Sequence, residues 1–535
     1  MVIYSAHGLY MLKDRLDNVG TDFVLMFMNQ KKSGLPLQLF LTTPITAPVT
    51  VKIQTPEDLS LVQIDMTLKV YNNNTTNVVI PEILKSELKS EKTYKSILVT
   101  SDDVIVLFAS NMQFKSTDSC VVYPTDTLSN EYIAVSRESD TPNPAFIGSN
   151  IGVVALEVGV VSFYLPTNIS VLFDSSTYTG EMHITLNKYE VFHLVTTDVT
   201  GILIKANITV AAFSGHSFLK FGDTSGDHME VMLPPLKSLG RQYMVVKKPS
   251  YQHTPELIRV VSTAELTNIN ISYNSSNYGV ELQGMGAYYD FDLPITGALI
   301  NSDKAILVAQ ISTSRCIDGV VGDSSMSLAF HPDYLSSEYI FGVPVKQGTN
   351  LHQYNLLIIA ETKYIMNVLF DNIHLDPLAS WVSISNSEFS VAEIEDITEG
   401  EHTLSSDGPE AKLAGIVHGI GNGEHFQAAI GRYLGVPRDQ INTSKDDNTD
   451  RLRQTTSVQR FQDYLPSEPP FHNTTKGSPI MCLALCLEYS ACYLLATKPY
   501  LGGATDSVIC LLYTTVGASG RLRSEHGYTL YRRFA

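Results

Sequence analysis

Short apolar runs separated by turn-forming residues recur along most of the chain. β-branched and aromatic residues dominate segments such as VVSFYL, NISVLFD, EVFHLV and AILVAQI. Gly, Asn, Asp, Ser and Pro separate these segments at intervals of about 8 to 12 residues, which is typical of strands in β-sandwiches and barrels. Few segments of helical length carry an apolar period of about 3.6 residues. The pattern therefore predicts a mainly β protein built from tandem antiparallel, sandwich-like repeats.

Three passages of the chain repeat the same order of parts. A polar pair precedes an apolar strand, an Asp-containing loop follows, and a Pro-bearing apolar segment ends shortly before a Tyr. The loop acids are Asp118, Asp227 and Asp323, and the tyrosines are Tyr132, Tyr243 and Tyr339. Phe23 replaces the Tyr in a partial first copy, and the four anchors lie 109, 111 and 96 residues apart. A period of about 100 residues suits a sandwich-sized domain better than a solenoid repeat or one propeller blade.

We expect these repeats to occupy residues 1–436 as four units. Their approximate bounds are 20–130, 131–241, 242–338 and 339–436. Because the repeated motif could bridge neighbouring units, separate sandwiches and a propeller-like arrangement are both open. After Val436 the chain becomes polar and Pro-punctuated, which predicts a linker over 437–470 and a further domain over 471–535. No apolar run reaches the length of about 18 to 20 residues of a membrane helix, so no membrane span is expected.

Four of the six cysteines fall within 29 residues near the C-terminus. Such a cluster indicates two disulfides, which persist in an oxidising compartment. The alternative is a zinc site, whose usual spacings this cluster fits poorly. The four are Cys482, Cys486, Cys492 and Cys510. Cys120 and Cys316 lie at related points of two repeats and could form a third disulfide or remain buried thiols.

Glycosylation sequons agree with an extracellular location. The Asn-x-Ser/Thr motifs are at Asn73, Asn74, Asn168, Asn207, Asn270, Asn274, Asn442 and Asn473. No signal peptide is visible at the N-terminus, so we expect the N-terminus of this sequence to be incomplete. The formal net charge is −18 without a dense Lys/Arg cluster, which argues against a nucleic-acid partner.

The best catalytic candidates are the charged residues of one loop. An acid–base or metal site needs such groups to converge in a cleft, as His216, Asp223, Asp227 and His228 could. The Asp recurs in other repeats without a His beside it, however, which favours a bond from its side chain to a turn. Ser101-Asp102-Asp103 could bind calcium or form a solvated turn. Because GxSxG, HExxH, Walker and GxGxxG motifs are missing from convincing settings, we expect no enzyme activity, no cofactor and no metal.

The ordered motifs resemble the N-terminal domain family of IgGFc-binding proteins. The matching pieces are GTDF at 20–23, SDD at 101–103, TDS at 117–119, AAFSGH ending in Ser214, Gly215 and His216, and Asp227-His228 before LPPLKSLGRQY. The resemblance covers about residues 15–436 and includes the closing segment from Gly400 to Phe426. Relatives commonly carry cysteines beside the SGH motif, and SFLKFGDTSGDH has none here. The resemblance implies an extracellular binding or adhesion scaffold.

The C-terminal segment, about 471–535, resembles the PAN/apple fold. That fold consists of a short helix strapped by disulfides to a small antiparallel sheet. The likeness implies Cys482–Cys510 and Cys486–Cys492 pairs, although four cysteines allow three connectivities. Modules of this kind bind proteins or carbohydrates.

Three functional interpretations follow. The first is a secreted, non-enzymatic adhesion or recognition protein that binds extracellular protein or glycan ligands through β-unit loops and the apple-like module. The second is an extracellular, glycosidase-like hydrolase with a site near His216 and Asp227, which would need two carboxylates about 5 to 9 Å apart in a cleft. The third is a structural component of mucus or matrix.

Overall fold

Strands make up most of the described protein, which confirms the mainly β class. The computed structural model describes residues 18–434 with short gaps, together with five strands between 458 and 533. The gaps are 57–61, 142–147, 223–225, 249–255, 274–275, 294–296, 314–315, 318–319, 322, 346–348, 350, 377, 409, 422–423 and 433. The chain divides into two compact units, Met1–Ser444 and Lys445–Ala535. No helix among the described residues is long and apolar enough to cross a membrane.

The larger unit contains four β-sandwiches, and the first shows the common plan. Its strands are β1 (Val19–Leu25), β2 (Leu37–Thr42), β3 (Val49–Gln54), β4 (Asp65–Val70), β5 (Thr76–Ile80), β7 (Ile97–Gln113) and β8 (Ser116–Val122). One sheet has the order β1-β7-β3-β4 and the other β5-β2-β7-β8, and all pairs are antiparallel. The 17-residue strand β7 belongs to both sheets, because its first half pairs with β1 and β3 and its second half with β2 and β8.

The second sandwich repeats this plan with β16 as the long shared strand. Its strands are β9 (Ser129–Ile133), β10 (Ser149–Ala155), β11 (Gly159–Tyr164), β14 (Glu181–Leu186), β15 (Val191–Thr196), β16 (Leu203–Leu219) and β17 (Asp227–Met232). Short strand β6 (Glu91–Thr93) joins its edge beside β15. A two-stranded hairpin of β12 (Ser170–Phe173) and β13 (Ser176–Thr179) is inserted before β14.

In the third and fourth sandwiches the long strand is divided in two. The third contains β18 (Gln242–Val246), β19 (Glu256–Ser262), β20 (Leu266–Tyr273), β21 (Ser276–Gln283), β22 (Tyr288–Leu293), β23 (Gly297–Ser302), β24 (Ile306–Ser312), the hairpin β25 (Cys316–Ile317) with β26 (Val320–Val321), and β27 (Ser325–Leu328). The fourth contains β28 (Glu338–Val343), β29 (Leu351–Glu361), β30 (Val368–Phe370), β31 (Ile373–His374), β32 (Val382–Ser383), β33 (Phe389–Ile394), β34 (Gly400–Ser406), β35 (Leu413–Gly421) and β36 (Glu424–Ala429). Among the described residues of this unit, strands are connected by the 3-10 helices η1 (Glu82–Leu84), η2 (Thr125–Thr127), η4 (Leu236–Ser238), η6 (Pro332–Tyr334) and η7 (Thr362–Asn367).

The recurring tyrosines anchor the first strand of three sandwiches. The hydroxyl of Tyr132 accepts the N–H of Ser129 at 2.8 Å and donates to the carbonyl of Val210 at 2.8 Å. Tyr339 makes the same pair of bonds, from Ser336 at 3.0 Å and to Leu413 at 2.7 Å. Because a buried Tyr hydroxyl needs partners, each ring ties its own strand to the loop before it and to the long strand.

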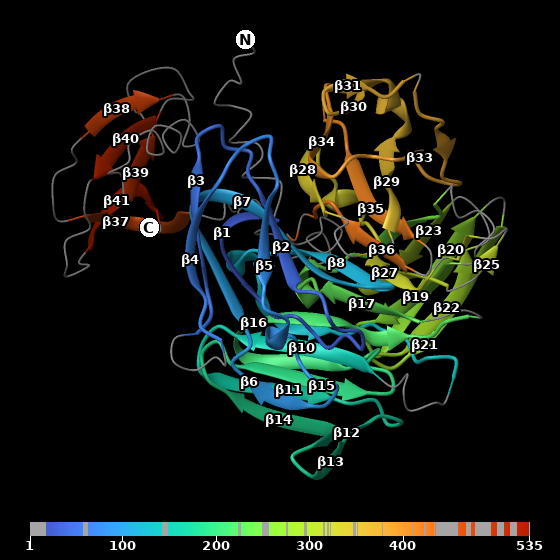
Figure 1. Cartoon of the computed structure of the whole chain (residues 1–535). Helices are drawn as coiled ribbons and strands as arrows, with labels where there is room; N and C mark the ends of the chain where they lie inside the picture. The colour runs from blue at the N-terminus through green and yellow to red at the C-terminus, as the bar shows by residue number, and fades with distance from the viewer. Residues whose placement is uncertain are drawn as a thin grey trace. The chain divides into compact units, whose positions relative to one another are not determined.

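The four sandwiches follow one another around a ring, from blue through green to orange in Figure 1. Their cores merge across the boundaries between them. One apolar cluster contains residues of the first and fourth sandwiches, a second joins the second and third, and another joins the third and fourth. Strands β2 and β28 meet where the first sandwich contacts the last, which closes the ring. A period of about 100 residues is therefore the length of one sandwich.

The smaller unit is described by the backbone of one sheet. Its strands run in the order β37 (Val458–Pro466), β41 (Leu522–Arg533), β39 (Leu494–Pro499), β40 (Val508–Tyr513) and β38 (His472–Lys476). Strand β37 lies within the stretch 437–470 that polar composition predicts as a linker. It pairs with β41, so this part of the stretch forms an edge strand of the sheet. The predicted helix at Cys482–Cys486 lies outside the described residues.

Candidate functional site

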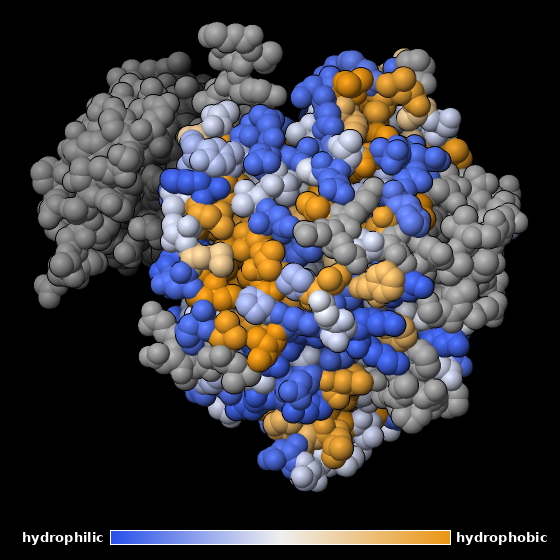
Figure 2. All heavy atoms as spheres, in the orientation of Figure 1, coloured by the Kyte–Doolittle hydropathy of each residue, from blue (hydrophilic) through white to orange (hydrophobic). Residues whose placement is uncertain are grey.

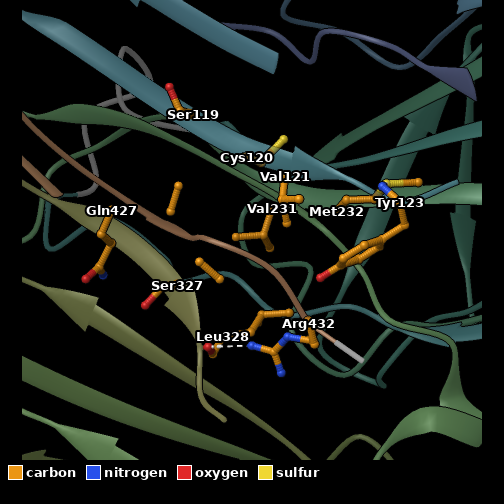
Figure 3. A pocket seen from close by; sticks show the side chains of 12 residues that line it. Ser119, Cys120, Val121, Tyr123, Val231, Met232, Ser327, Leu328, Gln427 and Arg432 are labelled. Carbon is orange, nitrogen blue, oxygen red and sulfur yellow. Dashed lines mark hydrogen bonds between the residues drawn. The ribbon is translucent and has the colours of Figure 1, made fainter. Parts of the chain in front are cut away.

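The last strands of the four sandwiches meet at the centre of the ring. These inner strands, β8, β17, β27 and β36, are each the edge of a sheet and pack against one another. Between them is a cavity of about 20 Å³, with space for about one water molecule. Figure 3 shows its lining, in which the Arg432 guanidinium donates to the carbonyl of Leu328 at 2.7 Å. Arg432 also donates to the carbonyl of Ala329 at 2.7 Å. Residues from all four sandwiches therefore line one small cavity.

Asp227 bridges three of the inner strands. It opens β17, is fully buried, and accepts the N–H of its neighbour His228 at 2.7 Å. It also accepts the N–H of Thr117 in β8 at 2.9 Å and that of His425 in β36 at 3.3 Å. Burial and repulsion from Asp323 raise the pKa of Asp227 well above its ordinary value, and the N–H donors oppose this rise. The motif acid thus holds the backbones of three sandwiches together.

Other sandwiches place acids at the same point. Glu424 is the first residue of β36 and accepts the N–H of Lys115 from the first sandwich. Asp227 precedes η4 by the same number of residues as Asp323 precedes η6. By the same spacing before η2, the equivalent residue in the first sandwich is Ser116 rather than Asp118. The hydroxyl of Ser116 accepts the N–H of His228 at 3.2 Å, so it takes the bridging role there.

Asp118 occupies a different position from the one that the sequence repeat predicts. It lies two residues into β8, where it accepts the N–H groups of Ser119 and of Glu230 in β17. Burial raises the pKa of Asp118 well above its ordinary value, and the charge of Glu230 adds to this effect. Asp118 therefore also connects the first two sandwiches, from a position two residues after Ser116 in β8.

The SGH motif packs β16 onto the segment that follows β9. Ser214 donates its hydroxyl to the carbonyl of Val135 at 2.6 Å, and the carbonyl of Gly215 accepts the hydroxyl of Ser136 at 2.7 Å. A Cβ on Gly215 would meet the carbonyl oxygen of Met229 at 1.8 Å, so only glycine fits. The motif is thus explained by close packing of buried strands.

The two motif histidines are fully buried. Nδ1 of His216 accepts the N–H of Phe218 at 3.0 Å. His228 contacts the carbonyl of His216 through Nδ1 at 3.1 Å and Glu230 through Nε2 at 3.3 Å. Because His216 and Asp227 have no exposed surface, a substrate cannot reach either side chain in this conformation. The geometry does not support the hydrolase interpretation at these residues.

Burial of His216 makes the stability of the ring depend on pH. Burial, and then repulsion by His228, lower the pKa of His216 to about 3, against about 6.5 in the unfolded chain. Below pH 6.5 the unfolded chain therefore binds a proton at His216 that the folded chain does not bind. The contribution of neutral His216 to the free energy of unfolding is complete above pH 6.5 and is lost as the pH falls.

Between pH 8 and pH 5, we expect the free energy of unfolding of the wild-type protein to fall by about 2 kcal/mol more than that of the His216→Leu variant. Urea denaturation of both proteins at the two pH values measures this difference. An identical pH dependence would show that His216 is not neutral and buried in the folded protein.

The acidic pair at 102–103 and two further buried histidines have ordinary partners. Within the described part of the chain, no three His, Cys, Asp or Glu residues are placed to hold a metal ion. Asp102 accepts the N–H of Thr50 at 2.6 Å, and Asp103 that of Val104 at 2.7 Å. Both lie within strand β7 and not in the turn that the sequence suggested. His418 contacts Glu393 at 2.7 Å, and His425 contacts the hydroxyl of Ser325 at 2.7 Å.

Five of the sequon asparagines are described with their side chains, and all five are exposed. They are Asn73, Asn74, Asn168, Asn207 and Asn270. Asn274 and Asn442 lie outside the described residues, and Asn473 is described by its backbone alone in β38. Exposure is what an oligosaccharide at these positions requires.

Cys120 is a buried free thiol in β8. This is the second of the two states that the sequence leaves open for it. Cys482, Cys486 and Cys492 lie outside the described residues, and for Cys316 and Cys510 only the backbone is described. The pairing expected from the apple likeness is therefore a prediction.

Charged anchors between sandwiches were not apparent from the sequence. Arg259 of the third sandwich is 3% exposed and donates to the carbonyl of Ser136 at 2.6 Å and to Asp198 at 3.0 Å, both in the second. Glu401 of the fourth accepts the N–H of Asn73 in the first at 2.7 Å, and burial raises the pKa of Glu401 to about 7. No local motif marks these residues, because their partners are distant in sequence.

Residues 118–419 match the family described as IgGFc binding protein, which is more than half of the chain. The chain belongs to the IgGFc-binding protein family. Human IgGFc-binding protein is 25% identical over 321 residues, covering 58% of this chain and 6% of that protein. The chain thus spans a small part of that relative's length. The family segment begins in β8 and ends in β35, so it includes the SGH motif, Asp227 and the two complete middle sandwiches.

Two solved structures align at low similarity. The major pilin of Streptococcus pyogenes is 6% identical, covers 77% of this chain and 98% of its own, and gives a TM-score of 0.13. The eight N-terminal Ig domains of Down syndrome cell adhesion molecule are 9% identical, cover 78% of this chain and 69% of their own, and give a TM-score of 0.08. Both scores are too low to support a shared fold with this member of the IgGFc-binding protein family.

Proposed function

We propose that this chain acts as a secreted, non-enzymatic recognition or adhesion protein for extracellular protein or glycan ligands. Membership of the IgGFc-binding protein family carries the proposal. The buried motif residues support it, because Asp227 and His216 join sandwiches instead of lining a cleft. A ring with merged cores is a rigid scaffold, and binding residues are commonly displayed on the loops of such scaffolds.

A PAN/apple-like module at 471–535 forms the second part of the proposal. Cys510 lies in β40, at the centre of three paired strands between β39 and β38. Cys482–Cys510 and Cys486–Cys492 bonds would staple a core of about 65 residues, which has little apolar area of its own. A second binding module on the same chain raises avidity when both modules contact one surface.

Secretion predicts a defined number of disulfides. We expect reduction to raise the mass of the deglycosylated full chain by about 4 Da, because each of two disulfides gains two hydrogens. Intact mass spectrometry before and after reduction measures the change. An increase of about 6 Da would mean that Cys120 pairs as well, and no increase would contradict an oxidising location.

The function is tested by binding of the intact chain, secreted from mammalian cells, to arrays of glycans and extracellular proteins. The protein array includes IgG Fc, because a relative's name mentions it. A heat-denatured sample of the same chain is the control for adhesion of unfolded protein. A saturable ligand for the folded chain alone supports the proposal, and no ligand on either array contradicts it. Retention in mucus without a discrete ligand would favour the structural interpretation instead.

A further inference from the structure

One edge strand of the fourth sandwich is much shorter than its counterparts in the other three. The edge strands β4, β14 and β21 of the first three have 6, 6 and 8 residues, and the corresponding β31 has 2. Because β31 is so short, the space between the two sheets is not covered. A groove of about 590 Å³ lies there, between β30, β31 and β33.

Apolar side chains are exposed along this groove. Ile373 in β31 is 61% exposed, and Leu378 in the following loop is 73% exposed. Both line the groove together with Phe370 of β30 and Ile394 of β33. Figure 2 shows hydrophobic residues gathered over β30 and β31. Contiguous exposed apolar residues are characteristic of a binding surface.

The same segment is strongly acidic. Residues 364–411 contain ten Asp and Glu residues and no Lys or Arg. Asp371, Glu393 and Glu395 line the groove itself. Asp371 contacts His402 at 2.8 Å and the buried Glu393 contacts His418 at 2.7 Å, whereas Glu395 is exposed. Glu395 and the net charge of the segment therefore place a negative potential beside the apolar floor. Such a field attracts cationic ligands and repels acidic glycans.

We propose that this groove, defined by Phe370, Ile373, Leu378, Ile394 and Glu395, binds an extended basic segment of a partner protein that carries alternating apolar residues. The inference rests on the proposed recognition function and names its partner class. Apolar side chains of the segment enter the groove while Lys or Arg side chains contact its acidic rim. Among the described strands β31 pairs with β30 on one side, so its other edge can also accept an added strand.

A fluorescent peptide of alternating Lys and Leu tests the proposal on the full chain. We expect saturable binding that weakens with salt, and at least about tenfold weaker binding of the Glu–Leu counterpart. Glu395→Lys and Leu378→Ser should each weaken Lys–Leu binding by about fivefold to tenfold. Glu157→Lys and Leu172→Ser, at exposed positions of the second sandwich, are the matched controls and should change it by less than about twofold.

Equal binding of both peptides, or equal effects of groove and control variants, would overturn the proposal. Self-association of the chain that is lost in Leu378→Ser would also overturn it, by assigning the groove to a second copy. A ligand found on the arrays whose binding is unchanged by Glu395→Lys would leave the recognition function standing and remove the groove from it. No array ligand, with intact Lys–Leu binding, would contradict the wider function alone.

Discussion

Replacing Asp227 with Ala is expected to lower the free energy of unfolding of the ring by about 3 kcal/mol or more. The substitution removes the acceptor of N–H groups from Thr117, His228 and His425, which belong to three sandwiches. Each buried donor left without a partner costs about 1 to 3 kcal/mol, and relief of the repulsion by Asp323 offsets part of that sum. Urea denaturation followed by circular dichroism measures the change.

Asp102→Ala is the matched control for this prediction. Asp102 also accepts a backbone N–H, from Thr50 at 2.6 Å, but it is exposed. Water can accept the Thr50 N–H in place of the carboxylate, so we expect the free energy of unfolding to fall by no more than about 1 kcal/mol. Equal losses for the two variants would show that Asp227 does not hold the sandwiches together.

Replacing Lys248 with Met is expected to cost about 3 to 5 kcal/mol. Nζ of Lys248 contacts Oε1 of Glu256 at 2.5 Å, and both side chains are almost fully buried. The Met variant leaves the Glu256 carboxylate in the core without its cation, which is the main cost. Ser312 donates to the same carboxylate at 3.3 Å and does not replace the lost charge.

A double-mutant cycle separates this effect from simple loss of packing. Lys248→Met combined with Glu256→Met should recover at least about 2 kcal/mol relative to the sum of the single variants. In the exposed pair Lys52–Asp65, at 3.3 Å, Lys52→Met should cost less than about 1 kcal/mol. Additive effects at the buried pair would mean that the two groups do not interact as charges.

Much of the strand structure follows from local pattern. Alternation of apolar and polar residues in strands such as β14, where every second side chain is buried, marks a sheet with one solvent face. The tyrosines recur because each hydroxyl bonds to the loop before its own strand. These signals act over a few residues, and a single sequence contains them.

The junctions between sandwiches could not be predicted in the same way. Asp227 bonds to Thr117 and His425, which are more than one hundred residues away on either side. Asp118 looks equivalent to Asp227 in the sequence, yet its distance from the 3-10 helix that follows makes Ser116 the equivalent residue of the first sandwich. Arg259 has no motif at all: it contacts Asp290 of its own sandwich and also Ser136 and Asp198 of the second, all distant in sequence.

The groove of the fourth sandwich had a sequence signal that only the structure makes meaningful. The absence of Lys and Arg from residues 364–411 is visible in the chain. Its consequence depends on the shortening of β31, which exposes Ile373 beside Asp371 and Glu395. Charge composition alone does not locate an open sheet edge.

Native-state hydrogen exchange of the full chain tests the central claim, that buried acids join four sandwiches into one body. The amides of Thr117, Glu230 and His425 each donate to a carboxylate of another sandwich. We predict that these three exchange at one common slow rate, set by global unfolding of the ring, and that Asp227→Ala accelerates all of them together. Different rates in β8, β17 and β36, each following its own sandwich, would contradict the account.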